Sequence, residues 1–266
     1  MSLSSALGLA ALASFLPGAI VPWRQRRRSA LFWGVLALAL VGAGAWAMAL
    51  TGSEWRTGLA QTLAVSILAA MLVFAAASVL HREAWRLALL LMPYLFLLCL
   101  VALAWQTVPS TPLGREAPAA WLDAHILLAV TAYGLLTLAA ITGLAVYVQE
   151  RALKARRPVA LTARLPSLAG CERLQIALLA TTEAVLALAL ATGFAAEYFI
   201  GQQPQGLGHK TVFSALAFLV IGGLLLAHAR TGLRGRRAAR VVLLAYLLLT
   251  LAYPGVRFVI DVLLKG

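Results

Sequence analysis

Four histidines are the side chains of this 266-residue chain that are best suited to holding a metal ion. Imidazole is the commonest protein ligand for metals, and two imidazoles facing each other in a helix bundle form a natural axial pair for a haem iron. No zinc spacing of the form H-E-x-x-H or H-x-x-E-H occurs, and the two cysteines, Cys99 and Cys171, have no C-x-x-C spacing. The candidate ligands are therefore His81, His125, His209 and His228.

The elements that must position these histidines are strongly apolar. Hydrophobic residues make up 62% of the chain and charged residues only 12%, against roughly 25% charged in an average soluble domain. Runs of about 18 or more apolar residues can cross a membrane as helices, and no segment alternates as the strands of a β-barrel do. We therefore predict an all-α integral membrane protein, with a single domain over 1–266 and eight transmembrane helices near 3–22, 30–50, 58–80, 87–106, 122–148, 174–200, 211–229 and 240–263.

The basic residues predict the orientation of this chain in the membrane. Of the 22 lysines and arginines, 17 fall in the loops after the first, third, fifth and seventh predicted helices. The positive-inside rule makes those loops cytoplasmic, so both termini are predicted on the outer, periplasmic side. The net charge of +13 is then a topology signal, and we expect no nucleic-acid partner.

The histidines divide into two pairs by their predicted depth. His125 lies about three residues inside the fifth helix, roughly 5 Å deep, and His209 immediately precedes the seventh helix. His81 ends the third helix, and His228 lies roughly 26 Å from the outer surface, at the cytoplasmic end of the seventh. One pair could meet at each face, and no single iron could take a ligand from both. The alternative is that each histidine is simply tolerated at a headgroup boundary.

The neighbours of the two deeper histidines would suit a haem in different ways. A haem needs apolar and aromatic walls, cations for its propionates and a partner that orients each imidazole. Around His125 the chain offers Trp121, Asp123 and Tyr133. Around His228 it offers Arg234, Arg236 and Arg237. These arginines could neutralise propionates, although holding the loop in the cytoplasm is the simpler role for them.

Glu183 is an acidic residue near the middle of the sixth predicted helix. A carboxylate at that depth costs roughly 2.5–3.5 kcal/mol on insertion scales, so such a residue is a candidate for function. It could carry a proton or pair with a buried cation, or it could be a protonated, hydrogen-bonded core residue. The chain has no Gly-rich phosphate loop with a lysine and no evident group for bond-making chemistry, so we do not expect an enzyme.

Three stretches together resemble a known family of membrane proteins. One is the histidine-bearing segment WLDAHILLAVTAYGLLTLAAITGLAVYV (121–148), and another is the connecting segment LPSLAGCERL (165–174). The third, HKTVFSALAFLVIGGLLLAHARTGLRGRRAARVVLLAYLLLTLAYPGVRF (209–258), has a lysine that opens a helix, a histidine near its end, a G-x-R-G-R-R-A loop and a Y-x-G-V-x-F motif. Their order and spacing resemble the cytochrome c assembly family, the CcsA, ResC and HemX-like proteins, most strongly over 121–260.

This resemblance implies haem handling. In the CcsA branch, haem is carried across the membrane and presented outside to apocytochrome c, with histidine ligands near each face. Matched position by position, the resemblance assigns His125 as the outer ligand of the haem iron and His228 as the inner one. The tryptophan-rich outer segment and the second external histidine of true synthetases are missing here. The chain therefore looks like the short YpjD-type branch.

The sequence thus predicts a multi-pass protein of the bacterial inner membrane that binds or guides haem for cytochrome biogenesis. Its expected partners are haem, membrane lipid and other cytochrome assembly proteins. The alternative is a haem-free accessory membrane subunit or a small-solute permease. The predicted iron ligands are His125 and His228, with His209 and His81 as candidate second ligands on their respective faces, and the rest of the predicted cofactor site is Trp121, Arg234, Arg236 and Arg237.

Overall fold

The described part of the chain is almost entirely helical. A computed structural model describes residues 2–25, 27–52, 55–108, 110–112, 119–156, 159–199 and 209–259. Within these residues, eight helices are long and apolar enough to cross a membrane, which confirms the predicted all-α membrane fold. They are α1 Leu3–Arg24, α2 Ala30–Thr51, α3 Leu59–Leu80, α4 Ala88–Trp105 with the preceding 3-10 turn η1 Ala84–Leu87, α5 Ala119–Lys154, α6 Leu168–Phe199, α7 His209–Thr231 and α8 Gly235–Thr250.

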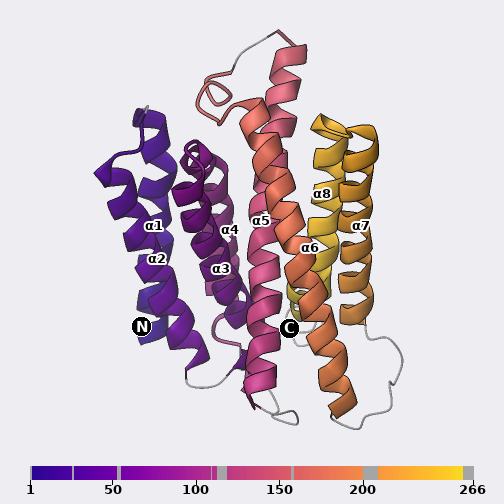
Figure 1. Cartoon of the computed structure of the whole chain (residues 1–266). Coiled ribbons are helices and arrows are strands. Elements are labelled where there is room, and N and C mark those ends of the chain that lie inside the picture. The colour runs from indigo at the N-terminus through magenta and orange to yellow at the C-terminus, as the bar shows by residue number, and fades with distance from the viewer. Residues whose placement is uncertain are drawn as a thin grey trace.

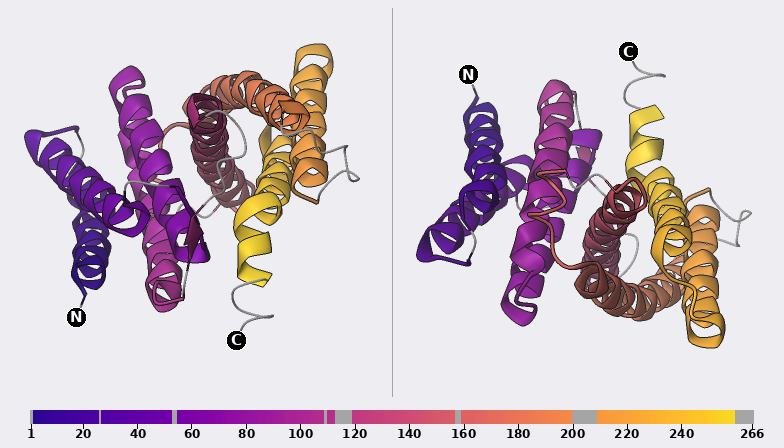
Figure 2. Two further views of the ribbon diagram at one scale, coloured as in Figure 1. Left: turned by 90° about the horizontal axis from the view of Figure 1, so that it is seen from below. Right: turned by 90° about the horizontal axis from the view of Figure 1, so that it is seen from above.

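Successive helices run in opposite directions along a common axis (Figure 1). The connections after α1, α3, α5 and α7 lie together at the upper end of this view, and α1 begins at the lower end, where α8 finishes. The basic loops therefore share one end of the bundle. Seen along the axis, α1 and α2 lie at one edge, α3 and α4 lie beside them, and α5 to α8 form a group on the other side (Figure 2).

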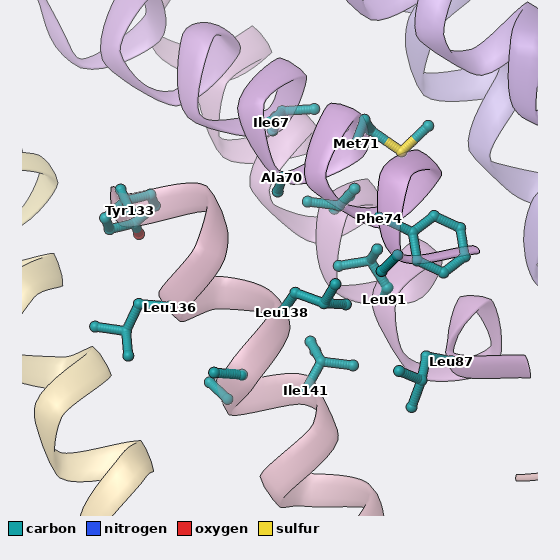
Figure 3. Close-up of a cluster of buried hydrophobic side chains, with 14 of the residues drawn as sticks. Ile67, Ala70, Met71, Phe74, Leu87, Leu91, Tyr133, Leu136, Leu138 and Ile141 are labelled. Carbon is teal, nitrogen blue, oxygen red and sulfur yellow. The ribbon is translucent and has the colours of Figure 1, made fainter. Parts of the chain in front are cut away.

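The two halves of the bundle meet where α3 packs against α5. Figure 3 shows this region, in which Leu138 of α5 lies beside Leu91 of α4, whereas Met71 and Phe74 lie on the side of α3 away from α5. A Cβ atom on Gly134 would lie only 2.9 Å from the carbonyl carbon of Ala69. Glycine at this position therefore lets the α5 backbone approach the α3 backbone closely. This contact makes α5 the central element of the fold.

The helices α5 and α6 extend further than the hydropathy predicted. The connection between them covers residues 155–167, whereas we expected it over 151–173. Cys171 was predicted in that loop, and this prediction is wrong because the residue is buried in the first turn of α6. The physical reason is Ser167, whose hydroxyl accepts a hydrogen bond from the Gly170 N–H and starts the helix there.

Two irregular segments lie at the end of the bundle opposite the basic loops. We call this the outer end, and the end with the basic loops the cytoplasmic end, after the orientation that the positive-inside rule predicts. The short strands β1 Arg56–Thr57 and β2 Thr111–Pro112 pair antiparallel and join the loop after α2 to the loop after α4. Beyond α8 the chain forms a π-helical turn, η2 Leu251–Gly255, and a final turn, α9 Val256–Phe258. Pro254 has no N–H to donate to the carbonyl four residues earlier, which favours the wider turn. The predicted end of this helix at residue 263 lies outside the described residues.

Candidate functional site

A partly open cavity lies at the outer end of the group formed by α5 to α8. Its volume is about 370 Å³ and its walls are mainly apolar. Pockets that take small ligands and cofactors typically have volumes of roughly 300–1,000 Å³, so this cavity is of ligand size. Its polar side chains include Arg56, Ser66, His125, Tyr133, Lys210 and Ser214. The cavity therefore combines an apolar interior with one imidazole and two cations.

His125 is held against α6 in one defined tautomer. Its Nδ1 atom lies 3.1 Å from the hydroxyl oxygen of Thr192. That hydroxyl also lies 2.9 Å and 3.0 Å from the carbonyl oxygens of Leu188 and Ala189. Carbonyl oxygens can only accept hydrogen bonds. The Thr192 hydroxyl therefore donates to its own helix and accepts from the Nδ1–H of His125. The Nε2 atom keeps its lone pair, and a second-shell hydrogen bond of this kind is typical of metal-binding histidines.

Trp121, one turn before His125, strengthens the same contact between α5 and α6. Its indole N–H donates to the backbone oxygen of Thr192 at 2.9 Å. We predicted Trp121 as a wall of the cofactor site, but it is not among the residues that line the cavity. Its place in the structure is beside the cavity, where it fastens the helix that carries His125.

The two cations of the cavity come from elements far apart in the sequence. Arg56 belongs to β1, and its guanidinium donates to the hydroxyl and the backbone oxygen of Ser110 at 2.9 Å and 2.8 Å. Lys210 opens α7, and its ammonium lies 5.7 Å from the ring centroid of Tyr253 in the π-helical turn. Both lie at the outer end of the bundle, so they place positive charge at the mouth of an apolar cavity. Such a mouth favours a ligand with anionic groups.

At its inner end the cavity meets a chain of hydroxyl groups. Tyr133 lies eight residues beyond His125, about 12 Å further along α5, and its hydroxyl is 3.1 Å from that of Tyr246 and 3.3 Å from that of Thr250. Thr250 donates to the carbonyl oxygen of Tyr246, so it accepts from Tyr133. Tyr133 then accepts from Tyr246, which in turn accepts from Tyr94 of α4. Tyr133 can therefore offer a cavity ligand an acceptor but no proton.

The other three histidines lie away from the walls of this cavity. His209 is exposed at the first residue of α7, next to Lys210 and at the same end of the bundle as His125. His228 lies in the last turn of α7 at the opposite end, and its Nδ1–H donates to the Leu233 carbonyl oxygen at 2.9 Å. His228 thus also keeps the Nε2 lone pair. His81 is exposed and lines a smaller cavity, of about 280 Å³, at the cytoplasmic end.

The three predicted arginines occupy the start of α8. Arg234 is the residue before the helix and is exposed, as is Arg237. The guanidinium of Arg236 lies over the ring of Tyr147 on α5, 4.9 Å from its centroid. Arg236 is thus engaged in a cation–π contact between α8 and α5, whereas the side chains of the other two are free of the helix interface.

Sequence reasoning missed several residues of the cavity. Trp55 and Arg56 come from the loop after α2, and Trp55 donates its indole N–H to Asp123 at 2.8 Å. Lys210 of the cavity wall was missed as well, and so was Thr192, which does not line the cavity but bonds to His125. One signal was available, because only five of the 22 basic residues are on the outer face and two of them, Arg56 and Lys210, line the cavity. A rare outer cation indicates function more strongly than one in a basic loop.

The eight helices and the outer cavity define a multi-pass membrane protein with a ligand-sized site near one surface. The sequence model of the family described as "Cytochrome C assembly protein" matches residues 30–264. The chain belongs to the cytochrome c assembly protein family, and its role is in cytochrome c biogenesis. The match begins further toward the N-terminus than the motifs over 121–260, and assignment to the short branch stays a prediction.

A relative of nearly equal length is known. The chain is 49% identical over 270 residues, covering 99% of this chain and all of the relative, to the "Uncharacterized 28.8 kDa protein in nifR3-like 5'region" of Azospirillum brasilense. No solved structure gives a significant match. The site must therefore be interpreted from its own geometry.

Proposed function

We propose that the outer cavity binds haem for cytochrome c biogenesis, with Nε2 of His125 as a ligand of the haem iron. The observation that carries this proposal is the hydrogen bond from His125 to Thr192. It leaves the imidazole oriented, with its lone pair available, at the wall of a cavity of ligand size. His209, exposed at the same end, is the candidate second ligand.

The character of the cavity fits an amphiphilic macrocycle with two carboxylates. The apolar walls suit the ring, and the two cations, Arg56 and Lys210, would hold the propionates toward the outer surface. Tyr133 and Tyr253 supply aromatic surface. When bound, haem supplies a redox-active iron, and the groups of this chain orient the ring, hold its carboxylates and exclude water from its inner edge.

A second, inner haem position would use His228. Its Nδ1–H is donated to the Leu233 carbonyl, so its Nε2 is available in the same way as that of His125. His81 is the candidate second ligand on this face, and Arg234, Arg236 and Arg237 would neutralise propionates there. Histidines at both ends of the bundle would let haem be received on the cytoplasmic side and held near the outer side.

The setting of this function is the bacterial inner membrane. The basic connections after α1, α3, α5 and α7 would lie in the cytoplasm, against anionic lipid headgroups. The outer cavity would then face the periplasm, where partners from the same assembly pathway would meet the bound haem.

Haem binding to the purified protein tests the proposal. The full-length protein in detergent is titrated with haem, and the Soret band is recorded for the wild type, His125→Gly and Thr181→Val. We expect His125→Gly to weaken haem binding by roughly tenfold or more, since even the loss of an outer-shell partner costs about 10–100-fold. Added imidazole should restore the band in His125→Gly, because it can occupy the space of the missing ring.

The exposed Thr181 of α6 is the matched control, because its hydroxyl donates to the Ala177 carbonyl oxygen of its own helix and its replacement should leave haem binding unchanged. A wild-type protein that stays colourless and takes up no added haem would contradict the proposal. That result would favour a haem-free accessory subunit or a small-solute permease. Unchanged haem affinity in His125→Gly would also contradict the assignment of the ligand.

A further inference from the structure

Glu183 is a carboxyl group that the proposed haem site does not use. It lies in the central part of the membrane-spanning segment Leu168–Ala195 of α6. Its Oε1 atom would be 2.7 Å from a Cβ atom on Gly222 of α7, so the carboxyl packs directly against the α7 backbone. Its Oε2 atom is excluded from solvent and has no hydrogen-bond partner among the residues that the structure describes. The carboxyl therefore lies inside the interface between α6 and α7.

Among the described residues, no charged side chain bonds to Oε2 of this carboxyl. The hydroxyls beside it on α6, of Thr181 and Thr182, donate to the carbonyl oxygens of Ala177 and Leu178 on their own helix. On the helices that pack against α6, the titratable side chains nearest to Glu183 in position along the bundle axis are Tyr133 of α5 and His228 of α7. Neither of them bonds to Oε2 in the described part of the structure.

An unpaired carboxylate at this depth is energetically unfavourable. Transferring an isolated charge into an apolar environment is so costly that the group takes up a proton instead. The buried and unpaired position of the Glu183 carboxyl therefore favours its protonated, neutral form as long as no cation is near it. Leu186, three residues further along α6, lines the outer cavity, so Glu183 lies about 5 Å below the cavity wall along the helix axis.

We propose that Glu183 is a proton-binding site of the α6–α7 interface, protonated while the cavity is empty, that releases its proton when a ligand with a cationic core enters the cavity. The O–H bond of the carboxylic acid breaks, the carboxylate stays in the interface, and the proton leaves through the cavity to the outer solution. Ferric iron in a porphyrin dianion gives the core of the macrocycle one net positive charge, while the two propionates would stay with Arg56 and Lys210 at the mouth of the cavity. Ferric haem is therefore such a ligand. This linkage to haem rests on the proposed function, whereas the protonated empty state does not.

The protonated state is tested first, without any ligand. Infrared spectra of the full-length protein near neutral pH should contain the carbonyl stretch of a buried carboxylic acid, which Glu183→Gln removes. Glu172→Gln, eleven residues earlier on the same helix, is the matched control and should keep this band. Gly222→Ala should shift the band, since a Cβ there displaces the carboxyl. A wild-type spectrum without this band, or a band that persists in Glu183→Gln, overturns the proposal.

The linkage is tested by titrating haem at several pH values. For ferric haem, the association constant of the wild type should rise with pH more steeply than that of Glu183→Gln, by up to about tenfold per pH unit for one released proton. Ferrous haem, whose core is uncharged, should show no such extra slope, which separates Glu183 from the titration of His125. Equal slopes in wild type and Glu183→Gln overturn the linkage. A protein that takes up no haem contradicts the proposed function and the linkage together, while the infrared band still decides the proton site.

Discussion

Gly193 of α6 lies directly against the imidazole ring of His125. A Cβ atom at this position would be 3.0 Å from Cε1, 3.6 Å from Nδ1 and 3.8 Å from Nε2 of the ring. The imidazole can therefore lie this close to the α6 backbone because residue 193 has no side chain. Together with the preceding Thr192, this glycine sets both the position and the tautomer of His125.

A large side chain at position 193 should displace the imidazole. We expect Gly193→Leu to lower haem affinity by roughly tenfold or more while the helices stay folded, because orienting partners of a metal ligand are worth about 10–100-fold. Haem titration followed by the Soret band measures the loss, and circular dichroism checks the helices. Gly223→Leu is the control, since a Cβ at that glycine meets nothing within 4 Å. Equal haem affinity in both variants would argue against the position assigned to His125.

Removing the Thr192 hydroxyl should release the tautomer of His125. Thr192→Val keeps the volume of the side chain but removes the acceptor for Nδ1–H, so either ring nitrogen can then carry the proton. We expect haem affinity to fall by about 10–100-fold. Thr181→Val is the matched control, because the Thr181 hydroxyl bonds only to Ala177 on its own helix. The idea fails if the two valine variants bind haem equally well.

Hydropathy predicted the membrane-spanning helices well, because the ends of a long apolar run set where such a helix begins and ends. The structure places α3 at Leu59–Leu80, one residue from the predicted 58–80. The limits of α5 and α6 were not predictable in this way, since both helices continue beyond their apolar runs into polar sequence. The start of α6 depends on Ser167 and on a carboxylate from another loop, Glu83, which is a contact between distant parts of the chain.

The candidate site was predictable only in part for a similar reason. His125 could be found because a histidine just inside an apolar helix is rare, and its depth placed it near the outer surface. Its partner Thr192 is 67 residues away, and no pattern marks a threonine within a helix as a hydrogen-bond acceptor. Arg56 reaches the cavity through a loop held by the pairing of β1 with β2. Only the folded arrangement shows these contacts.

The tyrosine chain should stabilise the contact between the two halves of the bundle. The Tyr246 hydroxyl lies between those of Tyr94 on α4 and Tyr133 on α5, so Tyr246→Phe leaves both neighbours with an unmade hydrogen bond. We expect Tyr246→Phe to lower the free energy of unfolding by about 1–3 kcal/mol. Tyr94→Phe removes only the first donor of the chain and should cost less. Unfolding in mixed detergent micelles measures both, and an equal or larger loss in Tyr94→Phe would contradict the direction of the chain.

The cytoplasmic end of α6 is capped by a carboxylate from the loop between α3 and α4. Glu83 accepts hydrogen bonds from the backbone N–H and the hydroxyl of Ser167, both at 2.9 Å. These hydrogen bonds favour the ionised form, the backbone one most strongly, with a smaller contribution from Arg86 and Arg173, and they lower the pKa of Glu83 below its ordinary value of 4.5. In a capping box this role belongs to a residue of the helix itself, whereas here a separate loop fulfils it.

Because the pKa of Glu83 is lower in the folded state than in the unfolded state, its stabilising effect is complete above about pH 4.5 and is lost as the pH falls through the folded-state value. We expect Glu83→Gln to lower the free energy of unfolding by about 1 kcal/mol near neutral pH, the usual cost of losing a helix cap. At about pH 3 the difference between wild type and variant should shrink, since the native carboxyl becomes protonated too. Thermal unfolding at the two pH values measures this, with Glu172→Gln in the first turns of α6 as the control. A difference that grows toward acid pH would show that Glu83 is held in its neutral form instead.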